Sequence, residues 1–213
     1  KVMRLAAMLH DIGKPVVKRP DKKEHSHFQG HPQMSDIMAE KILRRLKYDN
    51  DTIHRVRILV RYHDERPVLN DITVRRCMNE MDLDFNDLFE LKRADTLAQS
   101  EYMREEKLGY IDRFEQLYRA NLDKCTDKSQ LAVNGGDLIN EGINKGPQMG
   151  RIIDKMLDDV LTDPSQNTRE NLIPKAHIYD RLARAGKLFL GLFAVVLLVS
   201  SCSQTQQGNV SYR

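Results

Sequence analysis

The amino-acid sequence predicts an all-α protein, and three observations support this prediction. Leu is the most frequent apolar residue, whereas aromatic residues make up 6% of the chain and Trp is absent, a composition that favours helix packing. Apolar residues recur at the spacing of one helix face along most of the chain, and the alternation typical of strands is almost absent. A chain of 213 residues is long enough for one large or two small domains. We expect at least seven helices and no sheet of three or more strands.

Apolar stripes mark the predicted helices in chain order. They comprise Met34, Ile37, Met38, Ile42 and Leu46; Ile53, Val56, Leu59 and Val60; Leu88, Leu91, Ala94 and Leu97; Leu108, Ile111, Phe114 and Tyr118; and Ile152, Ile153, Met156, Val160 and Leu161. Asp51 or Thr52 is the expected cap of the second of these helices. Gly, Pro and Asn collect in the breaks, at residues 14–32, 67–71, 121–129, 134–150 and 163–167, where we expect turns.

The two ends of the sequence differ from the rest. Because residues 5–9 already follow a helical pattern, we expect a truncated N-terminus. Residues 188–202 form an uncharged stretch of fifteen residues, which is short for a membrane span of about 20. With basic residues before it and Val199-Ser200-Ser201-Cys202 at its end, this stretch resembles a lipoprotein signal. We expect residues 186–213 to be the joined start of an unrelated lipoprotein, outside the fold; a membrane anchor through residues 187–202 and a buried helix are the alternatives.

Charge is distributed unevenly, although the formal net charge is only +3. Residues 41–76 hold ten Lys and Arg against five acidic residues, whereas residues 77–130 hold eight basic and thirteen acidic residues. A basic face for a polyanion explains this asymmetry, and so do ordinary solvated helix faces. Cys77, Cys125 and Cys202 are too few and too scattered for a disulfide framework or a zinc knuckle. We therefore expect a reducing, cytoplasmic compartment.

Six of the seven His residues lie within the first 63 residues. His10 and Asp11 close an apolar helical pattern, His31 precedes a helix, and His63 ends the next one. Asp95 lies in an apolar stripe, where a buried carboxylate needs a partner or a metal ion. Imidazole and carboxylate together are ligands of divalent transition ions, which polarise phosphates and lower the pKa of water. Adjacent helical residues diverge by about 100°, so further ligands such as Asp95 must come from other helices.

The order and spacing of these residues resemble the HD superfamily of metal-dependent phosphohydrolases. The resemblance implies a divalent metal ion (Mn, Co, Ni or Mg) bound by His10, Asp11, His31, His63 and Asp95. It also implies catalytic roles for Asp11 and for Lys14, which would lie near a substrate phosphate. An earlier His of the superfamily pattern would precede residue 10 and is not in this sequence. The other four His, which we expect at the surface, are His25, His27, His54 and His177.

Further sequence strings resemble the body and tail of bacterial tRNA nucleotidyltransferases, the family of CCA-adding enzymes and poly(A) polymerases. The strings are Arg61-Tyr62-His63-Asp64, Val74-Arg75-Arg76, Lys92-Arg93-Ala94-Asp95-Thr96-Leu97-Ala98-Gln99, Leu131-Ala132-Val133-Asn134-Gly135-Gly136-Asp137-Leu138-Ile139 and Gly146-Pro147. The resemblance implies tRNA or another RNA as the partner, held by shape and backbone contacts. Pro147 can open a helix whose first amides attract phosphate. The predicted RNA-binding residues are Arg61, Arg75, Arg76, Lys92, Arg93, Asn134 and Gly146.

These resemblances predict an HD-domain bundle at residues 1–120 and a helical RNA-binding body and tail at residues 121–185. The family's catalytic head, with its Gly-Ser and Asp-x-Asp motifs, is not in this sequence, so we do not expect nucleotide transfer from it. One hypothesis is that the chain is the RNA-binding part of a tRNA nucleotidyltransferase with a metal-dependent phosphohydrolase site. The other is a free-standing HD phosphohydrolase that acts on nucleotides or cyclic phosphodiesters.

Overall fold

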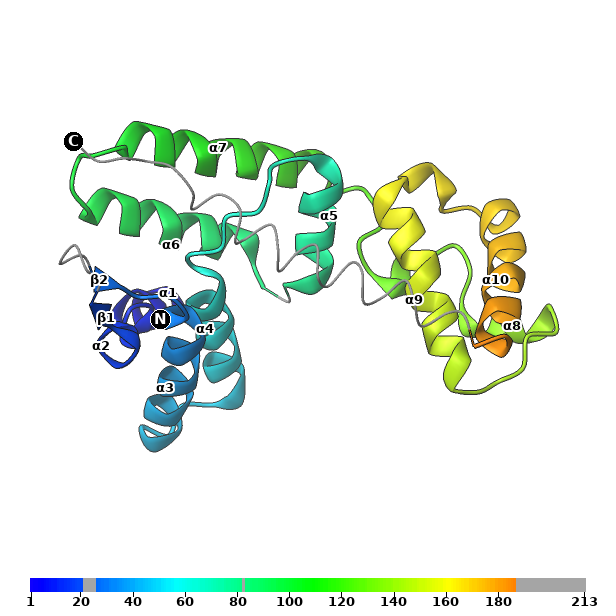
Figure 1. Ribbon diagram of the computed structural model, residues 1–213, viewed down its shortest axis with the longest axis horizontal. Coiled ribbons are helices and arrows are strands. Elements are labelled where there is room, and N and C mark those ends of the chain that lie inside the picture. Colours follow the sequence, from blue (N-terminus) through cyan, green and yellow to red (C-terminus); the bar gives the residue numbers. More distant parts are fainter. Residues whose placement is uncertain (21–25, 82, 187–213) are drawn as a thin grey trace. The chain divides into compact units, whose positions relative to one another are not determined.

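Figure 1 shows the fold in a computed structural model, which describes residues 1–20, 26–81 and 83–186. The α-helices of these residues are α1 (Val2–Leu9), α2 (Lys14–Val17), α3 (His31–Arg45), α4 (Asn50–Tyr62), α5 (Asp71–Glu80), α6 (Phe85–Ala98), α7 (Arg104–Ala120), α8 (Gly135–Asn140), α9 (Pro147–Thr162) and α10 (Arg169–Arg184). Two 3-10 helices, η1 (Lys128–Gln130) and η2 (Pro164–Gln166), and an antiparallel pair of two-residue strands, β1 (Arg19–Pro20) and β2 (Ser26–His27), complete the described elements. The predicted all-α fold is confirmed.

The chain divides into two compact units, Lys1–Lys124 and Cys125–Arg213, of which the second is described as far as residue 186. We call them the first and the second unit. The division falls close to the boundary predicted at residue 120. Each unit has its own apolar core.

In the first unit, α3 and α4 form a hairpin against which α1 packs, and α6 and α7 form a second hairpin next to α5. Aromatic rings fill the α6–α7 side of the core. Phe85 stacks on Tyr118 with ring centroids 4.9 Å apart, and Phe89 meets Phe114 edge to face at 5.2 Å. Such pairs add about 0.5–1.5 kcal/mol to the effect of burial. This cluster fixes the position of α6, which carries Asp95.

Two predicted helix faces are rotated relative to the observed core. In α3 the buried side chains include Ala39 and Leu43, whereas Ile37 and Leu46 are 48% and 57% exposed. In α6, Leu97 is 57% exposed, and the buried face continues through polar residues. The expectation that Asp95 lies in an apolar stripe was therefore wrong. The spacing of apolar residues cannot predict which polar side chains are buried with hydrogen-bond partners.

The cap of α4 also differs from the prediction. Asp49, in extended conformation, caps the helix by accepting hydrogen bonds from the backbone amide and the hydroxyl of Thr52, both at 2.7 Å. The helix therefore begins at Asn50, and the expected caps Asp51 and Thr52 lie in its first turn. A cap must lie outside the helix so that its side chain can turn back to the free amides.

The second unit packs α8, α9 and α10 around an aliphatic core. Ile152, Met156, Val160, Leu172 and Ala176 are fully buried. Polar contacts at the surface hold the connecting turns. Arg169, at the start of α10, donates to Asp137 and Glu141, in each case at 2.9 Å. This unit therefore combines an apolar interior with a hydrogen-bonded rim.

The predictions for the C-terminal segment lie outside the described residues. This applies to the lipoprotein-like signal at 186–213, apart from Gly186, and to the membrane contact through 187–202. Across the residues that the structure does describe, no helix has both the length and the apolar character needed to cross a membrane.

Candidate metal centre

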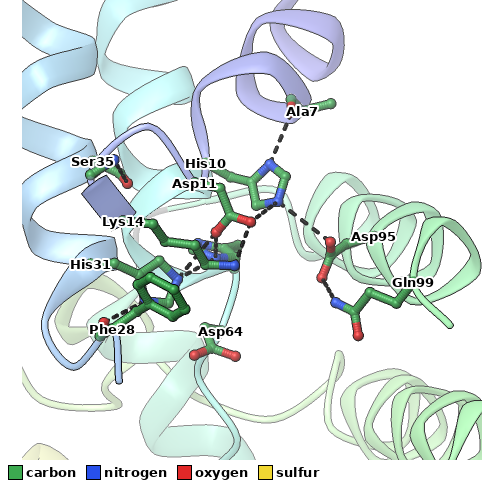
Figure 2. Close-up of polar contacts among 12 residues, drawn as sticks. Ala7, His10, Asp11, Lys14, Phe28, His31, Ser35, Asp64, Asp95 and Gln99 are labelled. Carbon is green, nitrogen blue, oxygen red and sulfur yellow. Dashed lines mark hydrogen bonds and ion pairs between the residues drawn. The ribbon is translucent and has the colours of Figure 1, made fainter. Parts of the chain in front are cut away.

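Side chains of the predicted metal site converge at the ends of three helices and on a fourth. His10 and Asp11 follow α1, His31 begins α3, and His63 follows α4, while Asp95 lies in the last turns of α6. Figure 2 shows the labelled members of this group facing a common centre. We call these five residues the His–Asp cluster.

Gly13 allows the chain after α1 to approach α3 closely. A Cβ atom at Gly13 would lie 2.7 Å from the Ser35 backbone nitrogen and 2.8 Å from the His31 carbonyl oxygen, which is too close for any other residue. The Gly13 amide also donates to Ser35 Oγ at 2.9 Å. This contact brings Asp11 next to His31.

Polar atoms of the cluster lie close to one another. His10 Nε2 is 3.3 Å from Asp11 Oδ2 and 3.4 Å from Asp95 Oδ1. Asp11 Oδ1 is 3.3 Å from His31 Nε2 and 3.6 Å from His63 Nε2. Asp95 of α6 thus approaches His10, at the end of α1, in agreement with the convergence expected from different helices. The binding of a metal by these residues stays a prediction.

The three imidazole rings are oriented in the same way. The Nδ1 atom of each ring lies close to the carbonyl oxygen three residues earlier: 2.9 Å for His10 and Ala7, 3.0 Å for His31 and Phe28, and 2.7 Å for His63 and Val60. A carbonyl oxygen can only accept a hydrogen bond, so Nδ1 carries the proton in each ring. In the neutral form of the rings, the lone pairs of Nε2 then point toward the centre.

In that form the lone pairs meet without a proton between them. His31 Nε2 and His63 Nε2 lie 3.2 Å apart, and in two neutral rings with Nδ1 protonated neither Nε2 has a proton to donate. His10 Nε2 and Asp11 Oδ1 are buried and lack a well-formed hydrogen bond. Buried acceptors that face each other are costly, and a cation among them removes that cost.

The electrostatics of the cluster depend on burial and on the two carboxylates. The neighbouring Asp95 carboxylate raises the pKa of His10, and His10 in turn lowers the pKa of Asp95. Burial, together with the nearby His10 and His31, lowers the pKa of His63 to about 4. Near neutral pH, His63 is therefore neutral, the form that binds metals.

The donor set fits a divalent transition ion. Donor atoms of His10, Asp11 and His63 lie within 4.8 Å of one another, and imidazole nitrogen with carboxylate oxygen suits Mn, Co, Ni or Zn. A backbone carbonyl on the second ring nitrogen is also the usual partner of a metal-binding His. Lys14 Nζ, the predicted phosphate contact, lies 2.6 Å from Asp11 Oδ2.

A pocket adjoins the cluster. It is lined by His63 and Asp95 of the cluster and by Asp64, Arg66, Lys92, Thr96, Lys107, Tyr110 and Ile111. Asp64, of the second His-Asp pair, is half exposed and lies 4.0 Å from Arg66. Of the two His-Asp pairs, the first contributes both residues to the cluster and the second contributes only His63.

Two predicted RNA-binding residues are buried in the first unit. Arg75, 6% exposed, donates from Nη1 to Asn121 Oδ1 at 2.8 Å. Lys92, 7% exposed, donates to the carbonyl oxygens of His63 and Glu65 at 2.7 and 2.6 Å. Their charged groups do not face solvent, so the expectation of direct RNA contact is corrected for both. Lys92 instead holds the segment that carries His63.

The other predicted RNA-binding residues have varied surroundings. Arg61 lies 3.5 Å from Asp36, and Arg93 binds Asp112 and Glu115 at 2.8 and 2.5 Å. Arg76 is half-buried. Asn134 caps α8, and Gly146 directly precedes α9. Of the four His residues expected at the surface, His54 is exposed and His177 is half-buried. The side chains of His25 and His27 lie outside the described part of the structure.

Gln99 has a place at the cluster that the sequence did not reveal. Its Nε2 donates to Asp95 Oδ2 at 2.7 Å, as Figure 2 shows. The spacing of four residues between Asp95 and Gln99 on a helix was the available signal. The sequence string that contains both residues indicated only a family resemblance.

Fold and cluster together define an all-helical protein with a candidate divalent-metal site. Residues 28–176 match the family model for tRNA nucleotidyltransferase domain 2, and the chain belongs to that family. The matched segment includes His31, His63 and Asp95 but begins after His10 and Asp11.

Two curated relatives resemble the chain. A CC-adding tRNA nucleotidyltransferase from Thermus thermophilus is 32% identical over 164 residues, 73% of this chain and 35% of the relative. An A-adding tRNA nucleotidyltransferase from Deinococcus radiodurans is 26% identical over 156 residues, 71% of this chain and 36% of the relative. The chain thus spans about a third of the length of these relatives. No solved structure matches it significantly.

Proposed function

We propose that this chain binds tRNA and carries a divalent-metal centre that hydrolyses phosphoesters. Family membership and the names of the two relatives, both of which add nucleotides to tRNA, support the tRNA part. The convergence of three imidazole nitrogens and two carboxylates, with two buried atoms lacking a hydrogen bond, supports the metal centre and is the observation on which it depends.

The exposed basic residues near the end of α3 are the first candidates for tRNA phosphates. Within residues 41–76, Arg55, Arg57 and Arg61 are engaged in ion pairs with acidic side chains. Lys41 and Arg45 are exposed on α3. The start of α9 at Gly146-Pro147 provides backbone amides, which attract phosphate.

Salt dependence and charge reversal test the tRNA part. Binding of tRNA to the full chain should weaken steeply as salt rises, because counterions are released on contact. The double variant Lys41→Glu/Arg45→Glu should bind more weakly and with a shallower salt slope, by about 1 for each lost phosphate contact. Arg113→Glu, an exposed arginine of α7 in the acidic region, is the control. Equal loss in both proteins, or binding insensitive to salt, would contradict the proposal.

At the metal centre, the residues of the chain have distinct tasks. The Nε2 atoms of His10, His31 and His63 and the carboxylates of Asp11 and Asp95 would hold the ion, which when bound supplies positive charge that polarises a phosphate and acidifies water. Lys14 Nζ, beside Asp11, donates to a phosphate oxygen. Lys107, in the wall of the adjoining pocket, adds a second ammonium group near this centre.

Metal titration tests the second part. Calorimetry with Mn²⁺ should show binding to the full chain and a large loss of affinity in Asp11→Asn, whereas Asp64→Asn, in the other His-Asp pair, should bind like the unchanged protein. Hydrolysis of a 2′,3′-cyclic nucleotide should require Mn²⁺, Co²⁺ or Ni²⁺ and disappear in Asp11→Asn. Activity that survives this substitution would exclude the proposed centre.

The geometry of the cluster also fits the second hypothesis, a free-standing phosphohydrolase of nucleotides or cyclic phosphodiesters. The same assays separate the two. Hydrolysis together with salt-dependent tRNA binding supports the first hypothesis, whereas hydrolysis without measurable tRNA affinity supports the second.

A further inference from the structure

The carboxylate of Asp95 has two oxygens in different surroundings. Oδ1 faces the cluster, 3.4 Å from His10 Nε2, and Oδ2 accepts a hydrogen bond from Gln99 Nε2 at 2.7 Å. The side chain of Asp95 is 30% exposed, so burial alone does not hold its orientation. A carboxylate on an exposed helix face turns readily toward solvent, and the bond from Gln99 opposes that rotation.

The side-chain amide of Gln99 is itself oriented by a residue of α7. Lys107 Nζ donates to Gln99 Oε1 at 2.8 Å. An ammonium group only donates and a carboxylate only accepts, so the amide between Lys107 and Asp95 has one orientation that satisfies both. The amide therefore relays an orienting bond from Lys107 to Asp95, and neither Glu nor a hydrocarbon side chain at position 99 could do so.

The backbone at Gln99 is also held in place. Gln99 follows α6 as its C-cap in extended conformation, and its amide donates to the Asp95 carbonyl. Arg104 Nη2 donates to the carbonyl oxygen of Gln99 at 2.8 Å. The side chain of Gln99 thus starts from a fixed point one helical turn beyond Asp95.

We propose that Gln99, oriented by Lys107, is a positioning residue that aims Asp95 Oδ1 at the metal centre. The proposal rests on the proposed metal centre. It adds two consecutive hydrogen bonds, from Lys107 of α7 to Gln99 and from Gln99 to Asp95 of α6. Both Gln99 and Lys107 lie at or near the surface, so their substitution leaves the apolar core of the first unit intact.

The experiment compares full-length variants by Co²⁺ titration, with affinity and the visible absorption spectrum as readouts. Gln99→Met keeps the length of the side chain and removes both hydrogen bonds. It should weaken Co²⁺ binding about tenfold, the lower end for the loss of an outer-shell partner, and alter the spectrum. Gln116→Met, an exposed glutamine of α7, is the matched control and should change neither affinity nor spectrum. The melting temperature without metal should be the same in both variants.

Coupling between the two relay residues makes the test specific. Lys107→Met should weaken Co²⁺ binding less than Gln99→Met, and the double variant should bind no more weakly than Gln99→Met alone, because Lys107 acts through Gln99. Additive losses, or Gln99→Met with unchanged affinity and spectrum, would overturn the relay. If the unchanged protein fails to bind Co²⁺, the proposed metal centre itself fails, which is a different result.

Discussion

In the first unit the buried side chains include His31, His63, Asp36, Arg75 and Lys92, whereas the described core of the second unit is aliphatic and Asp180 is its buried charged residue. A buried polar group costs free energy unless it has a partner. The first unit meets this cost with carbonyl oxygens and ion pairs, and it brings the buried His31 and His63 together in the His–Asp cluster. The second unit places its polar contacts at helix caps and turns. The candidate site therefore lies in the first unit.

The largest expected effect is the loss of aromatic packing in the first unit. Phe114→Ala removes a ring that is 1% exposed and contacts Phe85 and Phe89. We expect the free energy of unfolding of the first unit to fall by about 3–5 kcal/mol, measured by urea denaturation. Tyr102→Ala, at a residue that is 58% exposed, is the control. If the second unit lost stability equally, the two cores would not be independent.

A smaller effect separates the site from the core. Gly13→Ala places a Cβ atom 2.7 Å from the Ser35 nitrogen, and the resulting shift of backbone should cost about 1–3 kcal/mol and weaken Mn²⁺ binding. Gly109→Ala, where a Cβ meets nothing within 4 Å, should instead stabilise α7 by about 0.5–1 kcal/mol. Thermal unfolding and metal titration measure both. Unchanged metal affinity in Gly13→Ala would show that this close contact does not position Asp11.

Metal affinity should depend on pH in the first unit. Asp95 raises the pKa of His10 above its ordinary value of 6.5, so below that pKa the ring holds a proton that an ion must displace. The affinity for Mn²⁺ should therefore fall as pH drops from 8 to 6, by at most about tenfold per pH unit for one proton. His63, with a pKa of about 4, does not change its protonation between pH 8 and pH 6 and so does not contribute to this pH dependence. Calorimetry in buffers of different ionisation heat should detect the released proton, and a flat profile would contradict this assignment.

The smallest expected effect concerns a cap in the second unit. Asn134 accepts hydrogen bonds from the amides of Gly136 and Asp137, so Asn134→Ala should cost about 1 kcal/mol. Asn134→Asp retains the acceptor and should retain stability. Denaturation and tRNA titration on both variants separate the cap from the predicted RNA contact. Weaker tRNA binding by Asn134→Ala with unchanged stability would favour the RNA contact.

The periodicity of the sequence was sufficient to predict the buried face of α9 but not the buried faces of α3 and α6. In α9 the predicted Ile152, Met156, Val160 and Leu161 are buried, and the predicted Ile153 is half-buried. Because the core of the second unit is aliphatic, the hydrophobicity of the side chains alone determines which face of α9 is buried. In α6 the buried Lys92 reaches carbonyl oxygens of the segment after α4. Such partners come from distant parts of the chain, so apolar spacing alone misplaced this face.

The candidate site was likewise predicted only in part from the sequence. The residues His10, Asp11 and Asp95 were predicted to converge from their type and spacing, and they do so. The carbonyl acceptors of the three rings and the bond from Gln99 to Asp95 were not predicted, since they depend on side-chain rotamers. Arg75 was assigned to RNA from its charge, but Asn121, far along the chain, engages it in the interior.

Each imidazole of the cluster is held by a carbonyl oxygen of its own turn. The rotational freedom of the rings is therefore already lost when the first unit folds, with or without an ion. Binding of an ion then restricts the side chains of these residues little further. The loss of side-chain entropy, which otherwise opposes the binding of a ligand, is therefore small. Because each acceptor is local, a shift of one helix displaces its ring without turning the lone pair away from the centre.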